Sequence, residues 1–170
     1  MGVDFKVKEH LDIDESYPEI LKNEEIALYL AELKFDAYKG ELADKDLLIT
    51  ADTIVCIDNH VLGKPQNRDN AIKMIQLLSG RTHTVYTGIC VGSKNKKKVT
   101  YDKTEVTMIT LDSKDIEAYI DVCKPYDKAG SYGIQDWVGY VGIERISGSF
   151  YNVMGLPTHL LYNVLREFDD

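Results

Sequence analysis

The stretch DLLITADTIVCID, residues 46–58, has the composition of a buried strand with one misfit. Asp52 stands in the middle of an apolar run, and burying a lone carboxylate costs several kcal/mol. Three explanations stay open from the residues alone. Asp52 marks a strand end, or it is hydrogen-bonded to backbone, or it faces a cleft where it holds a metal ion or a water. Because sites in α/β sheets collect at strand ends, the third explanation is slightly favoured.

Helical and strand patterns follow one another along the rest of the chain. Helices are predicted over 23–40, 67–80, 112–123 and 157–168, each bounded by a capping residue, a glycine or a proline. Strands are predicted over 5–11, 46–57, 82–92 and 99–111, the last two as a hairpin. The segment 124–149 mixes loops and short strands with many glycines. We therefore expect one α/β domain over residues 1–170, with a mixed sheet.

Within the first predicted helix, Ile26, Leu30, Leu33 and Ala37 recur at helical spacing and predict its buried face. Asn23 is the expected cap of this helix, and Glu24 and Glu25 suit its first turn. The next two helices have two candidate caps each. These are Asn67 or Asp69, and Asp112 or Ser113.

Composition excludes several classes of protein. The chain has 170 residues, 44% of them hydrophobic and 28% charged, an ordinary globular balance. Its net charge of −8 argues against a nucleic-acid-coating role, and we expect the basic run KNKKK at 94–98 to be a solvated loop. Apolar runs are too short for a membrane span and no signal peptide is evident, so we expect a cytoplasmic protein without a membrane partner.

The cysteine pattern points the same way. The three cysteines, Cys56, Cys90 and Cys123, form no CxxC pair and are odd in number. Buried free thiols are therefore expected rather than disulfides or a metal site.

Several polar segments are weak indicators when taken singly. Lys64 in LGKP reads as a turn lysine, since the spacing of a P-loop is absent. The acids of DIDES at 12–16 form either a solvated loop or part of a magnesium shell. The glycines of PYDKAGSYGIQ at 125–135 would let a ligand approach the backbone closely. No histidine stands in a Ser-His-Asp or Cys-His arrangement, and only His83 beside Arg81 has a suggestive setting.

Taken together, these segments resemble the Maf family of nucleoside triphosphate pyrophosphatases. Six segments occur in the family's order and spacing, over nearly the whole chain. They are ITADTIVCID (49–58), VLGKP (61–65), LLSGRTHTVYTG (77–88), YDKTEVT (101–107), DKAGSYGIQ (127–135) and ISGSFYNVMGLP (146–157).

The resemblance implies a fold similar to that of inosine triphosphate pyrophosphatases. In that fold a twisted mixed sheet is flanked by helices, and two lobes enclose a cleft. It implies hydrolysis of a small-molecule nucleoside triphosphate to the monophosphate and pyrophosphate, assisted by a divalent cation, Mg²⁺ or Mn²⁺. The resemblance is compatible with a homodimer. The family is also linked to arrest of septum formation, a role that these residues do not explain.

The resemblance also implies site residues. They are Asp52 for catalysis and metal binding; Glu15 for metal binding; Lys34, Lys64 and Lys128 for phosphate binding; and Arg81 and Asp127 elsewhere in the site. In chemical terms the lysines offset charge on a triphosphate, while Asp52 accepts a proton from the attacking water or holds the metal that carries it.

Thr53 and Gln135 match the branch of the family that prefers dTTP and UTP, whereas a branch acting on 7-methylguanosine triphosphate carries a different residue at the Thr53 position. A glutamine amide presents an acceptor and a donor side by side, complementary to N3–H and the C4 carbonyl of uracil or thymine. Cytosine reverses this pattern, so discrimination requires an amide locked in one orientation. The alternative is that Gln135 merely satisfies backbone groups in its loop.

The sequence departs from the family at its start. The family's opening strand and its Ser-x-Ser-Pro-Arg-Arg segment have no counterpart here, which would remove an anion site at a helix N-terminus and expose neighbours in the sheet. Three explanations are open: a start upstream of Met1, which we favour; a non-catalytic nucleotide-binding or regulatory homologue; or arginines recruited from elsewhere, such as a partner chain.

Overall fold

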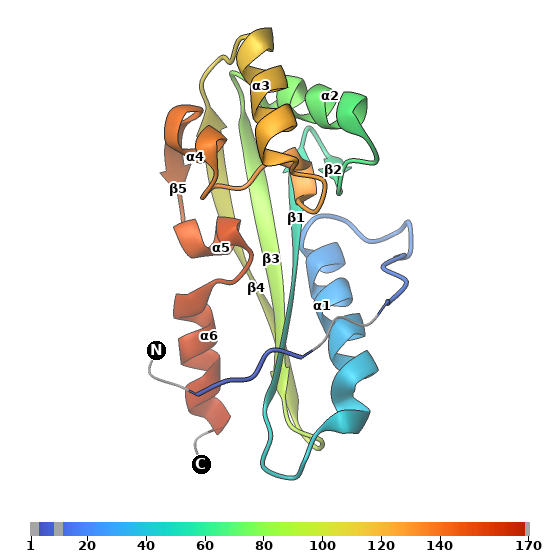
Figure 1. Ribbon diagram of the computed structural model, residues 1–170. Helices are drawn as coiled ribbons and strands as arrows, with labels where there is room; N and C mark the ends of the chain where they lie inside the picture. The colour runs from blue at the N-terminus through green and yellow to red at the C-terminus, as the bar shows by residue number, and fades with distance from the viewer. Residues whose placement is uncertain (1–3, 9–11, 169–170) are drawn as a thin grey trace.

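The computed structural model describes residues 4–8 and 12–168, and its framework is one five-stranded sheet (Figure 1). The strand order is β2-β1-β3-β4-β5, and every neighbouring pair is antiparallel. The strands are β1 (Leu48–Ile57), β2 (His60–Leu62), β3 (Thr82–Gly92), β4 (Lys97–Met108) and β5 (Ile143–Ser147). The helices are α1 (Glu24–Tyr38), α2 (Arg68–Leu78), α3 (Ser113–Cys123), α4 (Trp137–Val141), α5 (Phe150–Met154) and α6 (Thr158–Leu165). Single 3-10 turns complete the fold at η1 (Lys39–Glu41), η2 (Ala129–Ser131) and η3 (Arg166–Phe168).

The predicted α/β class, the four long helices and the β3–β4 hairpin are confirmed. The sheet differs from the mixed sheet that was expected, since all its pairs in the described residues are antiparallel. The reason lies in the turn at Asp58 and Asn59, whose φ values of 48° and 64° reverse the chain into β2. The connection through α2 then returns β3 antiparallel to β1.

Two local predictions are wrong. Residues 5–8 of the strand expected over 5–11 form no strand, and residues 9–11 lie outside the described residues. Phe5 and Val7 are 81% and 86% exposed, so their alternation does not reflect burial. The short helices α4 and α5 also went unpredicted, because one or two turns carry too few residues to show a helical period.

Helix capping follows the sequence in two of three cases. The Asn67 side chain accepts a hydrogen bond from the first turn of α2, and Asp112 does the same for α3. The Asn23 side chain makes no capping bond to α1, contrary to expectation; Glu25 instead accepts from the Lys22 N–H.

Helix α1 and helix α6 cover opposite faces of the long strands (Figure 1). The buried side of α1 contains Ile26 and Leu30 as predicted, with Leu33 half-buried, but Phe35 is buried whereas Ala37 is exposed. Gly88 on β3 makes this packing close. A Cβ at position 88 would lie 2.3 Å from the Ala27 carbonyl oxygen, so only glycine admits the helix at this distance.

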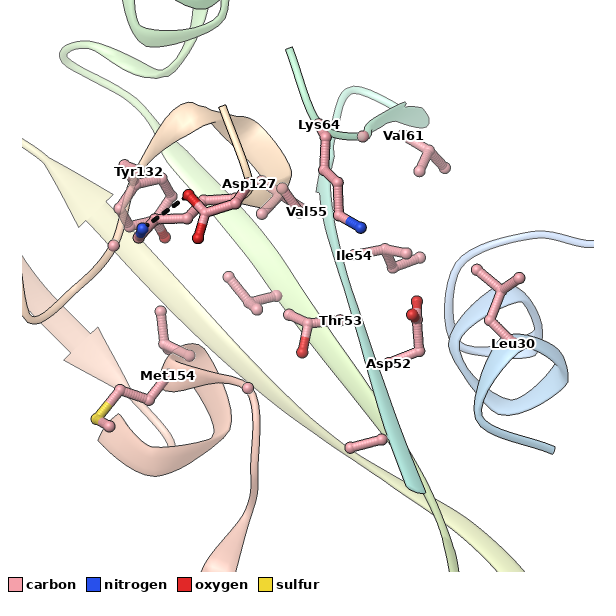
Figure 2. A pocket seen from close by; sticks show the side chains of 18 of the residues that line it. Leu30, Asp52, Thr53, Ile54, Val55, Val61, Lys64, Asp127, Tyr132 and Met154 are labelled. Carbon is pink, nitrogen blue, oxygen red and sulfur yellow. Dashed lines mark hydrogen bonds and ion pairs between the residues drawn. The ribbon is translucent and has the colours of Figure 1, made fainter. Parts of the chain in front are cut away.

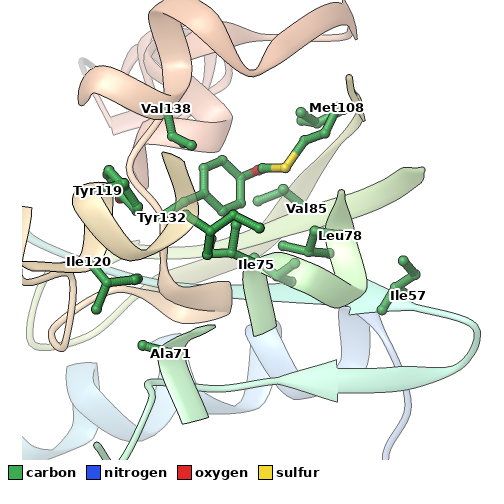
Figure 3. Close-up of a cluster of buried hydrophobic side chains, with 13 residues drawn as sticks. Ile57, Ala71, Ile75, Leu78, Val85, Met108, Tyr119, Ile120, Tyr132 and Val138 are labelled. Carbon is green, nitrogen blue, oxygen red and sulfur yellow. The ribbon is translucent and has the colours of Figure 1, made fainter. Parts of the chain in front are cut away.

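The largest apolar cluster lies at the other end of the sheet, beneath α2 and α3 (Figure 3). Tyr132, from the loop after α3, is part of this cluster and is 5% exposed. Its hydroxyl lies 2.7 Å from Nε2 of the buried His83, and the two rings meet edge to face. Burial lowers the pKa of His83 to about 4, so the ring is neutral at neutral pH.

Most lysines of the basic loop at 94–98 form ion pairs with acidic side chains. Lysines of the β3–β4 hairpin form ion pairs with acids on three other segments: Lys94 with Asp44, Lys97 with Glu32 and Asp36, and Lys98 with Glu167. Each exposed pair contributes little stability, about 0–1 kcal/mol. Three of the four lysines in this run are therefore paired with carboxylates, while Lys96 bonds to the Glu167 main-chain oxygen.

The expected free thiols are confirmed. Cys56 and Cys90 are buried, Cys123 is half-buried, and none forms a disulfide. No helix within residues 4–8 and 12–168 is long and apolar enough to cross a membrane.

Protonation of His83 should destabilise the protein in mild acid. The pKa of His83 is lower in the folded protein than its unfolded value of 6.5, so its contribution to the stability of the fold is fully present above pH 6.5. That contribution is lost as the pH falls toward about 4. We expect this contribution to the unfolding free energy to fall by up to about 3 kcal/mol across that window. Urea unfolding at stepped pH, compared with a His83→Gln variant, would measure it. Parallel curves for the two proteins would contradict this assignment.

Candidate functional site

Strand β1 sends its two central polar side chains to opposite faces of the sheet, because side chains alternate along a strand. Residues on the same face of β1 as Asp52, such as Ile54 and Cys56, pack against α1. Val55, on the same face of β1 as Thr53, packs in the cluster beneath α2 and α3. Figure 2 shows Asp52 directed toward α1 and Thr53 directed the other way.

A cleft of about 630 Å³ runs past this strand and touches both faces. The cleft lies where the outer edge of β1 has no neighbouring strand in the described part of the chain. Strand β2 pairs only with Val55, Cys56 and Ile57, so within the described residues no strand lies beside the outer edge of β1 from 48 to 54. The cleft is walled by α1 and the segment 15–17 on one side, and by the loop 127–135 and the end of α5 on the other.

A cluster of alternating charges fills the α1 side of the cleft. The Lys34 ammonium on α1 forms ion pairs with Asp52 and with Glu15, the latter at 2.9 Å. Lys64 Nζ lies 3.6 Å from the other oxygen of Glu15. Asp52 is 10% exposed and Lys34 19% exposed, so this pair is largely withdrawn from water. The partner that a buried carboxylate requires is therefore Lys34.

Burial and charge act against each other on these groups. Burial raises the pKa of Asp52, and Lys34 only partly offsets this, so its pKa lies above the ordinary value. Burial also acts on Glu15, but Lys34 and Lys64 outweigh it and lower the pKa. The two carboxylates in turn raise the pKa of Lys34 despite its burial, so Lys34 is charged at neutral pH.

The loop 127–135 carries a second charged group into the cleft. Lys128 Nζ lies 2.9 Å from Asp127 and 3.9 Å from Asp136. Gly130 donates its N–H to the Gly63 carbonyl, which joins this loop to the segment that carries Lys64. Gly130 has a φ of 68° and packs against Val55, so a side chain here would be both strained and crowded. Tyr132, held by His83, anchors the loop from below.

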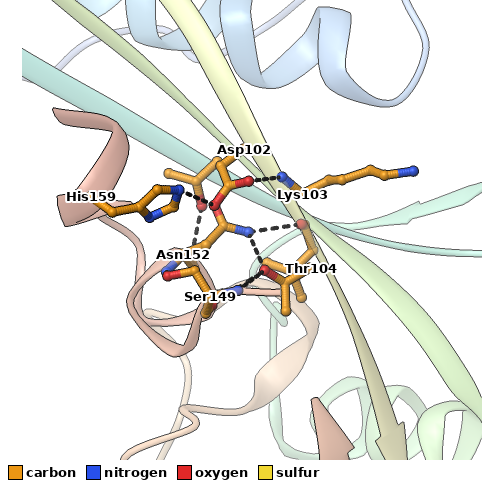
Figure 4. A network of polar contacts seen from close by, with 8 residues as sticks. Asp102, Lys103, Thr104, Ser149, Asn152 and His159 are labelled. Atoms are coloured by element: carbon orange, nitrogen blue, oxygen red, sulfur yellow. Dashed lines mark hydrogen bonds and ion pairs between the residues drawn. The ribbon is translucent and has the colours of Figure 1, made fainter. Parts of the chain in front are cut away.

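The other face of β1 leads into a hydrogen-bond network. Figure 4 shows the inner end of this network, where Asn152, Thr104 and Ser149 lie near Asp102 and His159. Thr53 bonds to Thr87 on β3, and Thr87 bonds to the main chain of Asn152 on α5. The Asn152 amide then donates to Thr104 on β4. This network fixes α5, whose last residue Met154 lines the cleft.

The cleft brings together eight of the nine site residues expected from the sequence. They are Glu15, Lys34, Asp52, Thr53, Lys64, Asp127, Lys128 and Gln135. Arg81 is the exception, since it precedes β3 and pairs with Asp58 instead of lining the cleft. Sequence reasoning missed Thr87, Asn152 and Tyr132. All three lie in segments that carried the resemblance, but a buried polar side chain is visible only once the fold is known.

Comparison with known proteins gives one consistent family. A family model described as "Maf-like protein" matches residues 1–168. A protein of Porphyromonas gingivalis named "dTTP/UTP pyrophosphatase" is 49% identical over 172 residues, covering 100% of this chain and 86% of its own. Proteins of the same name from Parabacteroides distasonis and Bacteroides fragilis are 49% and 48% identical, covering 99% and 98% of this chain and 87% and 86% of theirs.

Removing the Lys34 ammonium should leave Asp52 as an uncompensated buried charge. We expect Lys34→Met to lose roughly 2–4 kcal/mol of unfolding free energy at pH 7. Without Lys34 the pKa of Asp52 rises further, and protonation relieves the penalty, so the loss should shrink as pH falls. Urea unfolding at pH 7 and pH 5 would measure both effects.

The matched control is the double variant Lys34→Met/Asp52→Asn, which removes the carboxylate with its partner. It should recover much of the lost stability at pH 7. A single variant as stable as the original chain would contradict the account of the buried ion pair.

Proposed function

The chain belongs to the family of Maf-like proteins, and we propose that it hydrolyses dTTP and UTP to the monophosphate and pyrophosphate. The observation that carries the proposal is the cluster of Glu15, Lys34, Asp52 and Lys64 in one cleft. Relatives named "dTTP/UTP pyrophosphatase" cover the chain from end to end, which supports the same reaction.

The charges suit a triphosphate. Lys34, Lys64 and Lys128 line the same cleft, and each is paired with a carboxylate in the free protein. An arriving triphosphate supplies stronger anionic partners, so these lysines exchange carboxylates for phosphate oxygens. In the transition state they stabilise the charge that develops on the departing pyrophosphate.

Asp52 is the general base in this proposal. Its carboxylate reaches the cleft from a rigid strand, and its raised pKa makes it a better proton acceptor than an exposed aspartate. It accepts a proton from the water that attacks the α-phosphorus. The bond between the α-phosphorus and the bridging oxygen then breaks, and pyrophosphate leaves.

The carboxylates fit a divalent cation that arrives with the substrate. Within residues 4–8 and 12–168, no group of three or more His, Cys, Asp or Glu side chains could hold a metal ion. Mg²⁺, however, is commonly bound by one or two carboxylates, with substrate phosphates and water completing its shell. Glu15 and Asp52, which share Lys34 in the free protein, would supply those carboxylates. When bound, the cation would polarise the phosphate oxygens.

Pyrophosphate release would test the proposal. With Mg²⁺ or Mn²⁺, we expect turnover of UTP and dTTP in preference to CTP and GTP. Asp52→Asn should lower kcat by about 100-fold or more, because a general base contributes a factor of that order.

Arg81→Gln is the matched control, since Arg81 lies outside the cleft lining, and it should keep near-normal kcat. Nucleotide binding without turnover by the folded chain would overturn catalysis and leave a binding role. Undiminished turnover by Asp52→Asn would remove Asp52 from the reaction.

A further inference from the structure

Two buried hydroxyl groups hold the loop 127–135 from the side of the core. The Tyr132 hydroxyl lies 2.7 Å from Nε2 of His83 on β3. The Tyr119 hydroxyl on α3 accepts a hydrogen bond from the Gly133 N–H at 3.4 Å. Figure 3 shows Tyr119 and Tyr132 in the same apolar cluster, and His83, Tyr119 and Tyr132 are all buried. The backbone of the loop is therefore tied both to the sheet and to α3.

The pair of His83 and Tyr132 is an unfavourable way to fill a core. An imidazole and a phenol lose water when they are buried, and the bond between them offsets only part of that penalty. His83 Nδ1 adds to the penalty, because it has no hydrogen-bond partner among the described residues. Two apolar side chains of similar shape would avoid it. What the polar pair adds is direction, since a hydrogen bond requires a defined distance and angle whereas apolar contacts do not.

The side chain of Lys128 lies directly against the backbone that these hydroxyls hold. A Cβ at position 133 would lie 3.0 Å from Lys128 Cε and 2.6 Å from Oδ2 of Asp136, so only glycine leaves room for the lysine here. The Lys128 ammonium in turn lies 2.9 Å from Asp127 and 3.9 Å from Asp136. Where the Gly133 backbone lies therefore sets the path of the Lys128 side chain.

His83 can act on a bound ligand only through this loop. His83 and Tyr119 lie outside the lining of the cleft, whereas Lys128, Tyr132 and Gly133 are part of it. The sequence of contacts runs from His83 to Tyr132, along the backbone to Gly133, and from Gly133 to the lysine stem.

We propose that His83 is a positioning residue of the reaction, which acts through Tyr132 and Gly133 to hold the Lys128 ammonium where the departing pyrophosphate develops charge. The inference rests on the proposed function. A cation stabilises a transition state most when it is already in place as the charge develops. Misplacing such a group by about 1 Å can lower a rate by a factor of about 100.

The first test is kcat and KM for UTP in Tyr132→Phe, which removes one hydroxyl and keeps the ring in its cluster. We expect kcat to fall about tenfold, because the lysine is no longer held in place for the transition state. KM should change less than about threefold, since Lys34 and Lys64 still bind the triphosphate. His83→Leu should show the same pattern. His83→Gln, whose amide can still bond to the hydroxyl, should recover much of kcat.

A double variant separates positioning from a general loss of structure. In a chain that already carries Lys128→Met, Tyr132→Phe should lower kcat less than about twofold, because no ammonium is left to misplace. If the buried bond only stabilised the fold, Tyr132→Phe would lower kcat by the same factor with or without Lys128. Tyr119→Phe removes the second hydroxyl and should show the same dependence on Lys128, so the test does not rely on one variant folding.

Tyr86→Phe is the matched control. It removes a tyrosine hydroxyl from the α1 side of β3, outside the lining of the cleft, and should leave kcat unchanged. Urea unfolding of each variant, measured under the assay conditions, shows that the chain is folded when kcat is compared.

The outcomes separate the two proposals. If the original chain hydrolyses no nucleotide, the proposed function fails, and the inference fails with it because it assigns a role in that reaction. The inference alone is overturned if the chain hydrolyses UTP but Tyr132→Phe and His83→Leu keep kcat. It is also overturned if they lower kcat equally in the presence and absence of Lys128, which would leave His83 a role in stability alone.

Discussion

The ion pair between Lys34 and Asp52 is the constraint around which the site is arranged. A carboxylate that is 10% exposed on an apolar strand needs a cation close by. Lys34 supplies it from α1, which packs on β1 and β3. That packing depends on Gly88, where the helix backbone comes too near for any side chain. The close approach of helix and sheet and the chemistry of the cleft are therefore one structural feature.

The alternation of side chains along β1 divides the cleft into two environments. Glu15, Lys34 and Lys64 gather on the α1 side, whereas Thr53, Tyr132 and Met154 line the other side, to which the loop 127–135 adds the charged Lys128. A nucleotide has the same division, with a charged triphosphate at one end and a neutral base at the other. The unpaired outer edge of β1 lets a single ligand reach both environments. Under the proposed function, the α-phosphate binds beside Asp52 and the base binds beside Thr53, on opposite faces of the same strand.

Much of this arrangement could be predicted from the sequence, because strong local patterns carried it. The apolar run of β1 was predicted, and Asn67 was one of the two candidate caps of α2, because both have local physical causes. The antiparallel order of the sheet depends on how α2 returns the chain, which no local pattern encodes.

The site residues also differ in whether the sequence alone could predict their roles. Its charged residues stand in recognisable segments, whereas the roles of Thr87 and Asn152 arise from contacts between residues 65 positions apart. Discrimination by Gln135 was expected to require a locked amide, but its side chain is exposed and no hydrogen bond joins it to the described residues. Sequence identifies which residues are polar, but the direction in which a hydroxyl donates depends on the three-dimensional neighbours of that hydroxyl.

The most direct test of this division is a crystal structure of the chain with Mg²⁺ and a UTP analogue whose α-β bridge cannot be hydrolysed. The account predicts phosphate oxygens within hydrogen-bond distance of Lys34 and Lys64 on the α1 face. It predicts the uracil base on the opposite face, beside Thr53 and Met154. A ligand bound in the reverse sense, or with both ends on one face of β1, would contradict it.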